Sequence, residues 1–280
     1  MLKKKIAFIG SGAMAEAMIA GLIRNKLARP EDLLASGPRA ERGAELARKY
    51  SVIPLVENQQ AVHGAQVVVL SVKPQRLTQV MKNLKGIRSD ALVLSIVAGA
   101  SLKKISGGLK HTSVVRSMPN TPAQIGRGIT VWTASAAVSN SQKATAQTIL
   151  SALGEELFVE DENYLDMATA LSGNGPAYVF LFMEALIDAG VHMGFPRRIA
   201  ETLVVQTLQG SVEYYQKIGN HPASLRNQVT SPGGTSAEAL YYLEKAGFRT
   251  AISRAIWAAY QRSLELGKEL PGHIDTAAIE

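Results

Sequence analysis

Two glycine-containing turns, one near each end of the chain, carry residues that could bind a negatively charged group. The first is Gly10-Ser11-Gly12-Ala13-Met14-Ala15, which follows a short apolar run and precedes an amphipathic helical pattern at 16–24. In a strand–turn–helix unit, Gly10 allows a tight turn and Gly12 lets a dinucleotide pyrophosphate approach the backbone over the helix N-terminus. A glycine turn that binds nothing has the same spacing, so the rest of the chain must decide.

The second turn is Thr230-Ser231-Pro232-Gly233-Gly234-Thr235-Ser236. Here we expect Ser231 to cap a helix and Pro232 to occupy the first helical position. Two glycines in a first helical turn cost about 1 kcal/mol each relative to alanine, and a simple cap does not need them. Because glycines leave backbone N–H groups uncovered at the positive end of a helix, residues 233–236 are expected to hold a carboxylate. A glycine-softened bend without a ligand is the alternative.

The residues that are missing also limit the chemistry. A helical pattern follows Asn174, which is expected to be its N-cap, and between 178 and 190 it carries Glu184 and Asp188 but no lysine. Dehydrogenases of hydroxy acids with a similar two-domain plan use a lysine there for the alcohol proton. No Ser–His–Asp set is indicated, and the five histidines lack metal-ligand spacing. The bond that is reduced is therefore expected to need little proton assistance and no metal.

The end of a predicted strand at 33–36 indicates which dinucleotide is bound. The NAD-binding version of this unit has an Asp or Glu there, about 20 residues past the glycines. This chain has Ser36-Gly37-Pro38-Arg39, with Arg42 one helical turn later. A hydroxyl and a guanidinium would bind a 2′-phosphate, which a carboxylate would repel. We therefore expect NADPH, with NADH possible. The alternative is that Ser36 caps the helix predicted at 39–50 and the arginines are solvated.

A sheet must position these residues. Short apolar runs that alternate with helical patterns predict the strands of a sheet, and the continuous runs at 67–71 and 92–96 predict buried strands, the first of them parallel. The predicted strands are 6–9, 33–36, 67–71, 92–96, 114–116, 129–132 and 156–159. Ligands of such sheets bind beyond the carboxyl ends of the strands, and small or polar residues follow three of them, at Gly10, Ser71 and Val97. Residues 1–160 are thus expected to form a Rossmann-like, doubly wound α/β domain.

Beyond Glu160 the patterns are all helical. Helices are predicted at 164–171, 176–193, 196–215, 236–246 and 248–266. They carry more apolar residues than one helix face needs, as at Val179–Met183, and this excess predicts burial against a second subunit. Residues 161–280 are therefore expected to form an all-helical dimerisation and substrate-binding domain, with a loose tail after about residue 267.

Composition narrows the class of partner. Apolar residues make up 46% of the chain and charged residues 19%, which excludes disorder, and no apolar run is long enough to span a membrane. The net charge is +7, but the lysines and arginines are scattered without interleaved aromatic residues. This pattern favours a small anionic substrate over nucleic acid. No cysteine is present, so a cytoplasmic location is expected.

Six segments together resemble the pyrroline-5-carboxylate reductase family, in the family's order. They are IGSGAMAEAM from Ile9, SVKPQ from Ser71, SIVAGAS from Ser95, RSMPNTPA from Arg116, LSGNGPAY from Leu171 and TSPGGTSAEAL from Thr230. The resemblance implies NADPH-dependent reduction of 1-pyrroline-5-carboxylate to L-proline, the last step of proline biosynthesis. It also implies an intertwined helical homodimer that commonly assembles into a decamer of five dimers.

The patterns and the resemblance together give the expected site. The expected cofactor residues are Gly10, Ser11, Gly12, Ala13, Met14, Ser36, Arg39, Asn58, Ser71, Val72, Lys73, Pro74 and Ala98. The expected substrate residues are Ser231, Gly233, Gly234, Thr235 and Ser236, with the Ser236 hydroxyl as the catalytic group beside the ring nitrogen. Asn174, Asn227 and Ser236 depart from the family's more common serine, aspartate and threonine. The alternatives are a reductase of a six-membered cyclic imine and a non-catalytic protein of this fold, either a dinucleotide-binding regulator or a membrane-associated subunit.

Overall fold

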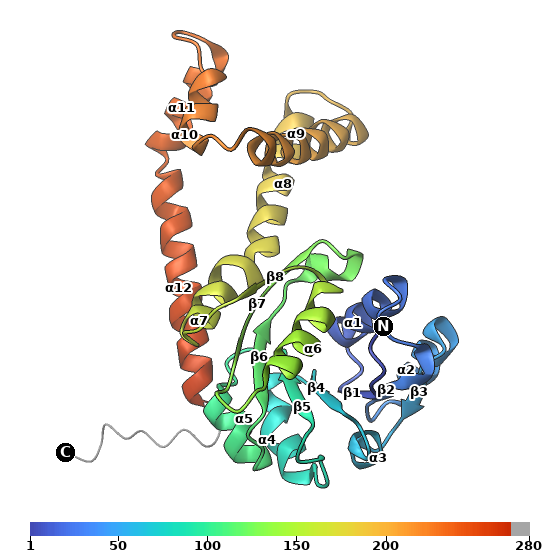
Figure 1. The fold of residues 1–280 in the computed structure, drawn as a ribbon. Helices are drawn as coiled ribbons and strands as arrows, with labels where there is room; N and C mark the ends of the chain where they lie inside the picture. Colours follow the sequence, from blue (N-terminus) through green and yellow to red (C-terminus); the bar gives the residue numbers. More distant parts are fainter. Residues whose placement is uncertain (270–280) are drawn as a thin grey trace, which may run out of the picture. The chain divides into compact units, whose positions relative to one another are not determined.

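The structure is a computed structural model that describes residues 1–269 (Figure 1). The chain forms two compact units. The first consists of Met1–Asn174 together with the described residues from Ala259 onward, and the second of residues 175–258. Each unit is described by itself below.

The first unit contains an eight-stranded sheet with the order β3-β2-β1-β4-β5-β6-β7-β8. Neighbouring strands are parallel except for β6 and β7, which are antiparallel. The strands are β1 Ile6–Ile9, β2 Leu33–Ser36, β3 Ile53–Leu55, β4 Val67–Leu70, β5 Leu92–Ser95, β6 Val114–Met118, β7 Gly128–Ala134 and β8 Gly154–Phe158. This sheet confirms the predicted doubly wound α/β class. All seven predicted strands are present with ends within two residues, but β3 was missed because it is a short edge strand that contains Pro54.

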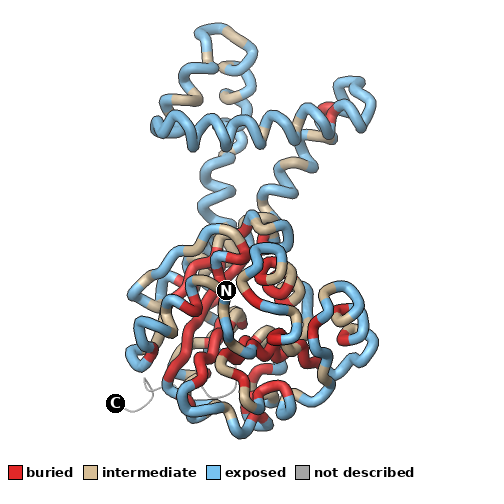
Figure 2. The backbone as a smooth tube through the Cα atoms, turned by 45° about the vertical axis from the view of Figure 1, so that its right-hand side comes forward, coloured by how far each residue is buried: buried red, intermediate tan, exposed pale blue. Residues whose placement is uncertain are grey.

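Helices cover both faces of this sheet because its central strands are apolar on both sides. Along β1, Ile6 and Phe8 belong to one buried cluster, while Ala7 and Ile9 belong to another. The first cluster takes apolar residues from α1, α2 and α6, and the second from α3, α4 and α5. Figure 2 shows that the buried residues gather in the interior of this unit. These helices are α1 Ala13–Arg24, α2 Ala40–Tyr50, α3 Asn58–Val62, α4 Pro74–Asn83, α5 Leu102–Leu109 and α6 Asn140–Ser151.

The second unit is built from helices that leave most of their apolar side chains exposed (Figure 2). Helices α8 and α9 cross closely, since a Cβ atom added to Gly190 would lie 3.0 Å from the Ala200 Cβ atom. Phe180, Leu181 and Trp257, by contrast, are each more than 60% exposed. An apolar surface of this extent marks an interface. The helices are α8 Gly175–His192, α9 Arg197–Ile218, α10 Pro222–Gln228, α11 Thr235–Lys245 and α12 Phe248–Glu269.

The boundary between the units differs from the one expected after residue 160. Helix α7 (Tyr164–Ala168), the π-helical segment Thr169–Gly173 and the end of α12 belong to the first unit. Polar contacts hold them there: Arg116 on β6 pairs with Glu162 and Asp166, and the Ser263 hydroxyl donates to Asp166 at 2.9 Å. Helix α12 continues past residue 267 to Glu269, and the rest of the expected tail lies outside the described residues.

Asn174 is not an N-cap. Its backbone is helical, with φ −87° and ψ −13°, whereas an N-cap residue is extended. Its N–H group donates to Thr169 O at 2.9 Å, which continues the π-helical turn into α8. The prediction failed because the glycines on both sides of Asn174 indicated a break that the chain does not make. Within the described residues, no helix has the length and apolar character needed to cross a membrane.

Candidate active site

The glycine turn after β1 is fastened to the loop after β4. Gly10 has φ +104°, and the Ser71 hydroxyl donates to Gly10 O at 2.7 Å. A Cβ atom added to Gly10 would lie 2.7 Å from Ser71 O. Only glycine therefore fits here, because both the backbone conformation and the space exclude a side chain. The two loops lie at one edge of the sheet, since Ile9 at the end of β1 is paired with Leu70 at the end of β4.

Gly12 lies at the open side of this turn. It is the N-cap of α1, it is exposed, and no heavy atom lies within 4 Å of the position its Cβ atom would take. Within the described chain, the N–H groups of Ala13 and Met14 have no acceptor. Empty space above uncovered N–H groups at the positive end of a helix suits a phosphate. The turn therefore fits the pyrophosphate of a dinucleotide.

The end of β2 contributes a second group of the expected cofactor residues. Ser36 is fully buried, and its hydroxyl donates to Asn58 Oδ1 at 2.7 Å, so the structure brings these two residues together. A Cβ atom on Gly37 would lie 2.6 Å from Ser11 Oγ, which places the end of β2 against the glycine turn. Ser36 does not cap α2, because the N-cap is Arg39. The Arg39 side chain is exposed and forms no hydrogen bond or ion pair with any described residue.

Arg42 and Glu16 join α2 to the glycine turn. Arg42 Nε donates to Ser11 O at 3.1 Å, and its guanidinium also pairs with Glu16 in the first turn of α1. Burial alone would raise the pKa of Glu16, but hydrogen bonds from Lys49, Arg42 and Tyr50 lower it to about 2. The sequence placed Arg42 near the cofactor, but its partner on α1 was missed. The only signal was a glutamate in the first turn of a helix.

The loops after β4 and β5 complete this edge of the sheet. Lys73 is the exposed N-cap of α4, and Pro74 occupies the first helical position, as expected. After β5, Val97 N donates to Ser95 Oγ at 3.2 Å, and the partly exposed Ala98 follows. Because Leu70 and Ser95 are register partners, these loops lie beside the glycine turn.

The start of α11 differs from the expected cap. Helix α11 begins at Thr235 with Gly234 as N-cap, so Pro232 is not the first helical residue. Instead, Ser231 O accepts from Gly234 N at 3.0 Å, and Gly233 has φ +71°. This is a β-turn with proline and glycine at its central positions, a common arrangement for these two residues. The helix therefore starts three residues after Pro232, which agrees within one residue with the predicted range 236–246, and Ser231 contributes its carbonyl rather than a capping hydroxyl.

The expected substrate residues are accessible at this helix start. Thr235 and Ser236 are exposed, and in the described chain their N–H groups have no acceptor. Ala237 N and Glu238 N both donate to Gly234 O, so the first N–H groups of the helix are the ones left uncovered. The Ser236 hydroxyl likewise forms no hydrogen bond with a described residue. These residues belong to the second unit and the cofactor residues to the first.

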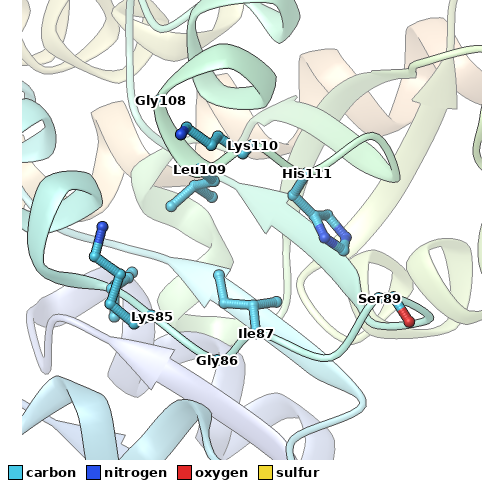
Figure 3. Close-up of a pocket in the computed structure, with 9 residues that line it drawn as sticks. Lys85, Gly86, Ile87, Ser89, Gly108, Leu109, Lys110 and His111 are labelled. Carbon is cyan, nitrogen blue, oxygen red and sulfur yellow. The ribbon is translucent and has the colours of Figure 1, made fainter.

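A cavity of about 290 Å³ lies elsewhere, at the amino ends of β5 and β6 (Figure 3). Lys85, Lys110 and His111 are among its lining residues, and none of the expected site residues lines it. His111 is buried there, with Nε2 2.7 Å from Ala91 O. Among residues 1–269, no three His, Asp or Glu side chains are arranged to hold a metal ion.

Comparison with known proteins relates both units to one family. A family model described as pyrroline-5-carboxylate reductase dimerisation matches residues 162–266, and one described as NADP oxidoreductase, coenzyme F420-dependent, matches residues 5–99. The pyrroline-5-carboxylate reductase of Synechocystis sp. is 44% identical over 265 residues, covering 95% of this chain and 99% of its own. The enzyme of Pseudomonas aeruginosa is 40% identical over 272 residues, covering 96% and 99%.

Solved structures agree with these relatives. The crystal structure of Plasmodium falciparum pyrroline carboxylate reductase with NADP bound has a TM-score of 0.88 and 32% identity, covering 95% of this chain and 99% of its own. A structure of the enzyme from Coxiella burnetii has a TM-score of 0.86 and 35% identity, covering the same shares of the two chains. The sheet, the glycine turn, the helical region and these relatives lead to one assignment: the chain belongs to the pyrroline-5-carboxylate reductase family.

Proposed function

We propose that this enzyme holds NADPH at the glycine-turn edge of its sheet and the carboxylate of its substrate at the start of α11. The chain is an NADPH-dependent oxidoreductase that reduces 1-pyrroline-5-carboxylate to L-proline, the last step of proline biosynthesis. When bound, NADPH supplies the hydride that adds to the C=N carbon. The residues of the chain therefore have to bind, orient and shield the reacting groups.

One observation carries the placement of the carboxylate: the uncovered N–H groups of Thr235 and Ser236 at the start of an eleven-residue helix. Gly233 and Gly234 precede them and place no side chain over them. A carboxylate accepts charge-assisted hydrogen bonds from such N–H groups and also gains from the helix dipole. The positive φ of Gly233 gives a reason for glycine at that position apart from the ligand. Gly234 has φ −81°, which any residue adopts, but a Cβ atom there would lie 3.1 Å from Ser231 O, so the tight turn and the proposed ligand both favour glycine at this position.

The reaction does not need a strong general acid. The C=N group of the substrate is readily protonated to an iminium, which already carries the positive charge that favours hydride addition. The Ser236 hydroxyl is the proposed hydrogen-bond partner of the ring nitrogen. Because an unperturbed hydroxyl is a weak acid, its contribution is chiefly orientation.

The chain self-associates through its helical region, which matches the dimerisation model of the family and has exposed apolar side chains. We propose an intertwined dimer of α8 to α12, with five dimers forming a decamer. The helices of the second unit bury too few of their own apolar side chains to be stable alone, and this supports the dimer. The absence of cysteine from the sequence supports a cytoplasmic location.

The carboxylate site can be tested with two imines. Replacing Gly234 by leucine covers the N–H groups of Thr235 and Ser236 and should lower kcat/KM for 1-pyrroline-5-carboxylate by at least about 100-fold, the effect of losing two charge-assisted hydrogen bonds. The same change should affect the slow reduction of 1-pyrroline, which has no carboxylate, far less. Gly234→Ala serves as the milder variant because its side chain is a single methyl group, and it controls for the close approach of that Cβ atom to Ser231 O at 3.1 Å.

The binding affinity for NADPH, measured by calorimetry, should stay unchanged in both variants because the cofactor residues belong to the first unit. An equal loss of activity on both imines would overturn the carboxylate site.

The Ser236 hydroxyl has a separate test. Ser236→Ala should lower kcat/KM about 10- to 100-fold, the effect of one hydrogen bond. Complete loss of activity in this variant would instead show that Ser236 is an essential acid.

A further inference from the structure

We propose that Arg42 and Glu16 are positioning residues that set the glycine turn for the cofactor pyrophosphate, and that Arg42 does not contact the 2′-phosphate. This inference rests on the proposed placement of NADPH at the glycine turn. It gives Glu16 a role that the sequence did not indicate, and it gives Arg42 a role other than the phosphate ligand that the sequence suggested.

The contacts of Arg42 use all three nitrogen atoms of its guanidinium. Nε donates to Ser11 O at 3.1 Å, one terminal nitrogen contacts Glu16, and the other lies 2.7 Å from Glu45 Oε2. The Arg42 side chain is only 17% exposed. Three of its five N–H groups are thus engaged by protein acceptors, and the low exposure of the side chain leaves little room for a phosphate.

Glu16 is the common acceptor between α1 and α2. Besides Arg42, it accepts from Lys49 Nζ at 2.7 Å and from Tyr50 Oη at 2.9 Å, and all three donors belong to α2. Its own backbone N–H donates to Gly12 O at 3.0 Å, so Glu16 also belongs to the first turn above the glycines. The carboxylate therefore ties the first turn of α1 to three residues of the neighbouring helix.

The link from Arg42 to the pyrophosphate site runs through one peptide group. The carbonyl of Ser11 and the N–H of Gly12 belong to the same planar peptide and point in opposite directions. When Arg42 holds the Ser11 carbonyl, it fixes the direction of the Gly12 N–H on the other side. That N–H is one of the donors available at the open, exposed Gly12. Losing Arg42 frees this peptide to rotate and removes its preorganisation for the phosphate.

Arg39, unlike Arg42, is free to bind the 2′-phosphate of NADPH. It lies one helical turn before Arg42, is exposed and has no partner among the described residues. The two arginines of this helix start therefore have separate roles. Arg39 is expected to distinguish NADPH from NADH, while Arg42 is expected to affect both cofactors equally because both contain the same pyrophosphate.

The test compares dissociation constants for NADPH and NADH, measured by calorimetry well below the melting temperature of each variant. We expect Arg42→Ala to weaken both cofactors by about 10-fold, the effect of one hydrogen bond, without changing their ratio. Arg39→Ala should weaken NADPH by 10-fold or more and leave NADH nearly unchanged. Arg48→Ala is the control, because Arg48 is exposed on the same helix and should change neither constant.

Glu16→Gln is a second variant in case Arg42→Ala does not fold. It keeps the shape of the side chain but weakens its hold on Arg42, and it should weaken both cofactors by the same smaller factor. A loss confined to NADPH in the Arg42 variant would overturn the inference, because it would identify Arg42 as a 2′-phosphate ligand. A lower melting temperature with both constants unchanged would also overturn it, since the pair would then only stabilise the fold. If the unmodified enzyme does not bind NADPH, the proposed function fails as well.

Discussion

Arg116 on β6 and Asp166 on α7 form an ion pair with a nitrogen–oxygen distance of 3.0 Å, although 50 residues separate them in the sequence. Arg116 is 4% exposed, and its other terminal nitrogen lies 3.0 Å from Glu162 Oε1. The Ser263 hydroxyl on α12 donates to the same Asp166 oxygen. One buried cation therefore holds the start and the end of the dimerisation region on the N-terminal sheet.

This pair should matter for stability. Asp166→Asn leaves Arg116 buried with half of its charge compensation, and should lower the free energy of unfolding by about 3 kcal/mol, near the lower end for breaking a buried pair. Asp90→Asn breaks the exposed pair with Arg88 and should leave the free energy of unfolding nearly unchanged, because solvent screens an exposed pair. Urea titration of both variants measures the difference. Equal effects would show that the buried pair contributes no more than a surface one.

Replacing each glycine of the first turn by alanine should affect a different property of the protein: stability at Gly10 and NADPH binding at Gly12. Gly10→Ala forces a side chain into positive φ and against Ser71 O, so it should lower the melting temperature. Gly12 has φ −77° and open space at the Cβ position, so Gly12→Ala should fold normally but bind NADPH at least about 10-fold more weakly. Thermal melts and calorimetry together separate the two effects. Normal NADPH binding by Gly12→Ala would contradict the proposed pyrophosphate position.

The lowered pKa of Glu16 predicts that the stability of the fold depends on pH. Its pKa is about 2 in the folded chain and about 4.5 in an ordinary environment, so the unfolded chain takes up a proton first as the pH falls. Its contribution to stability, roughly 2–3 kcal/mol, is complete above about pH 4.5 and is lost between about pH 4.5 and 2.

Glu16→Gln should therefore flatten the dependence of the unfolding free energy on pH in that window. The same variant should lose stability at pH 7. Urea titrations of both proteins at several pH values between 2.5 and 7 measure this difference. Parallel curves for the two proteins would show that the Glu16 carboxylate is not specifically stabilised in the folded state.

The apolar surface of α8 should be required for assembly. Leu181 is 66% exposed in the single chain, and Leu181→Glu should dissociate the oligomer because it places a charge in an apolar interface. Ile125 is 73% exposed on the first unit, and Ile125→Glu is the matched control that should leave assembly unchanged. Sedimentation velocity over a range of concentrations measures both. An active Leu181→Glu oligomer of unchanged size would exclude this part of α8 from the interface.

The sequence alone determined the features that depend on neighbouring residues. The strands, the turn at Gly10 and Gly12, the missing carboxylate after Ser36 and the family segments are all local patterns. Strand and helix periodicity follow from side-chain geometry over a few residues, and a glycine turn needs only its own backbone freedom. The fold class could therefore be predicted before any contact was known, and so could the position of the glycine turn that is proposed to bind the nucleotide.

Only the tertiary structure decided how distant side chains are used. The sequence predicts Arg42 as a phosphate ligand. In the folded chain its nitrogen atoms instead contact Ser11, Glu16 and Glu45. From the sequence, Ser36 is expected to bind the cofactor or, as the alternative, to cap a helix; the structure shows that it does not cap α2 and that its buried hydroxyl donates to Asn58, while the cofactor role stays a prediction. A polar side chain takes whichever partner the packing of separate elements brings within hydrogen-bond distance, and no local pattern records that partner. For the same reason, the change of composition at Glu160 does not indicate that Arg116 pairs with Glu162 and Asp166, which ties α7 to the strands of the first unit.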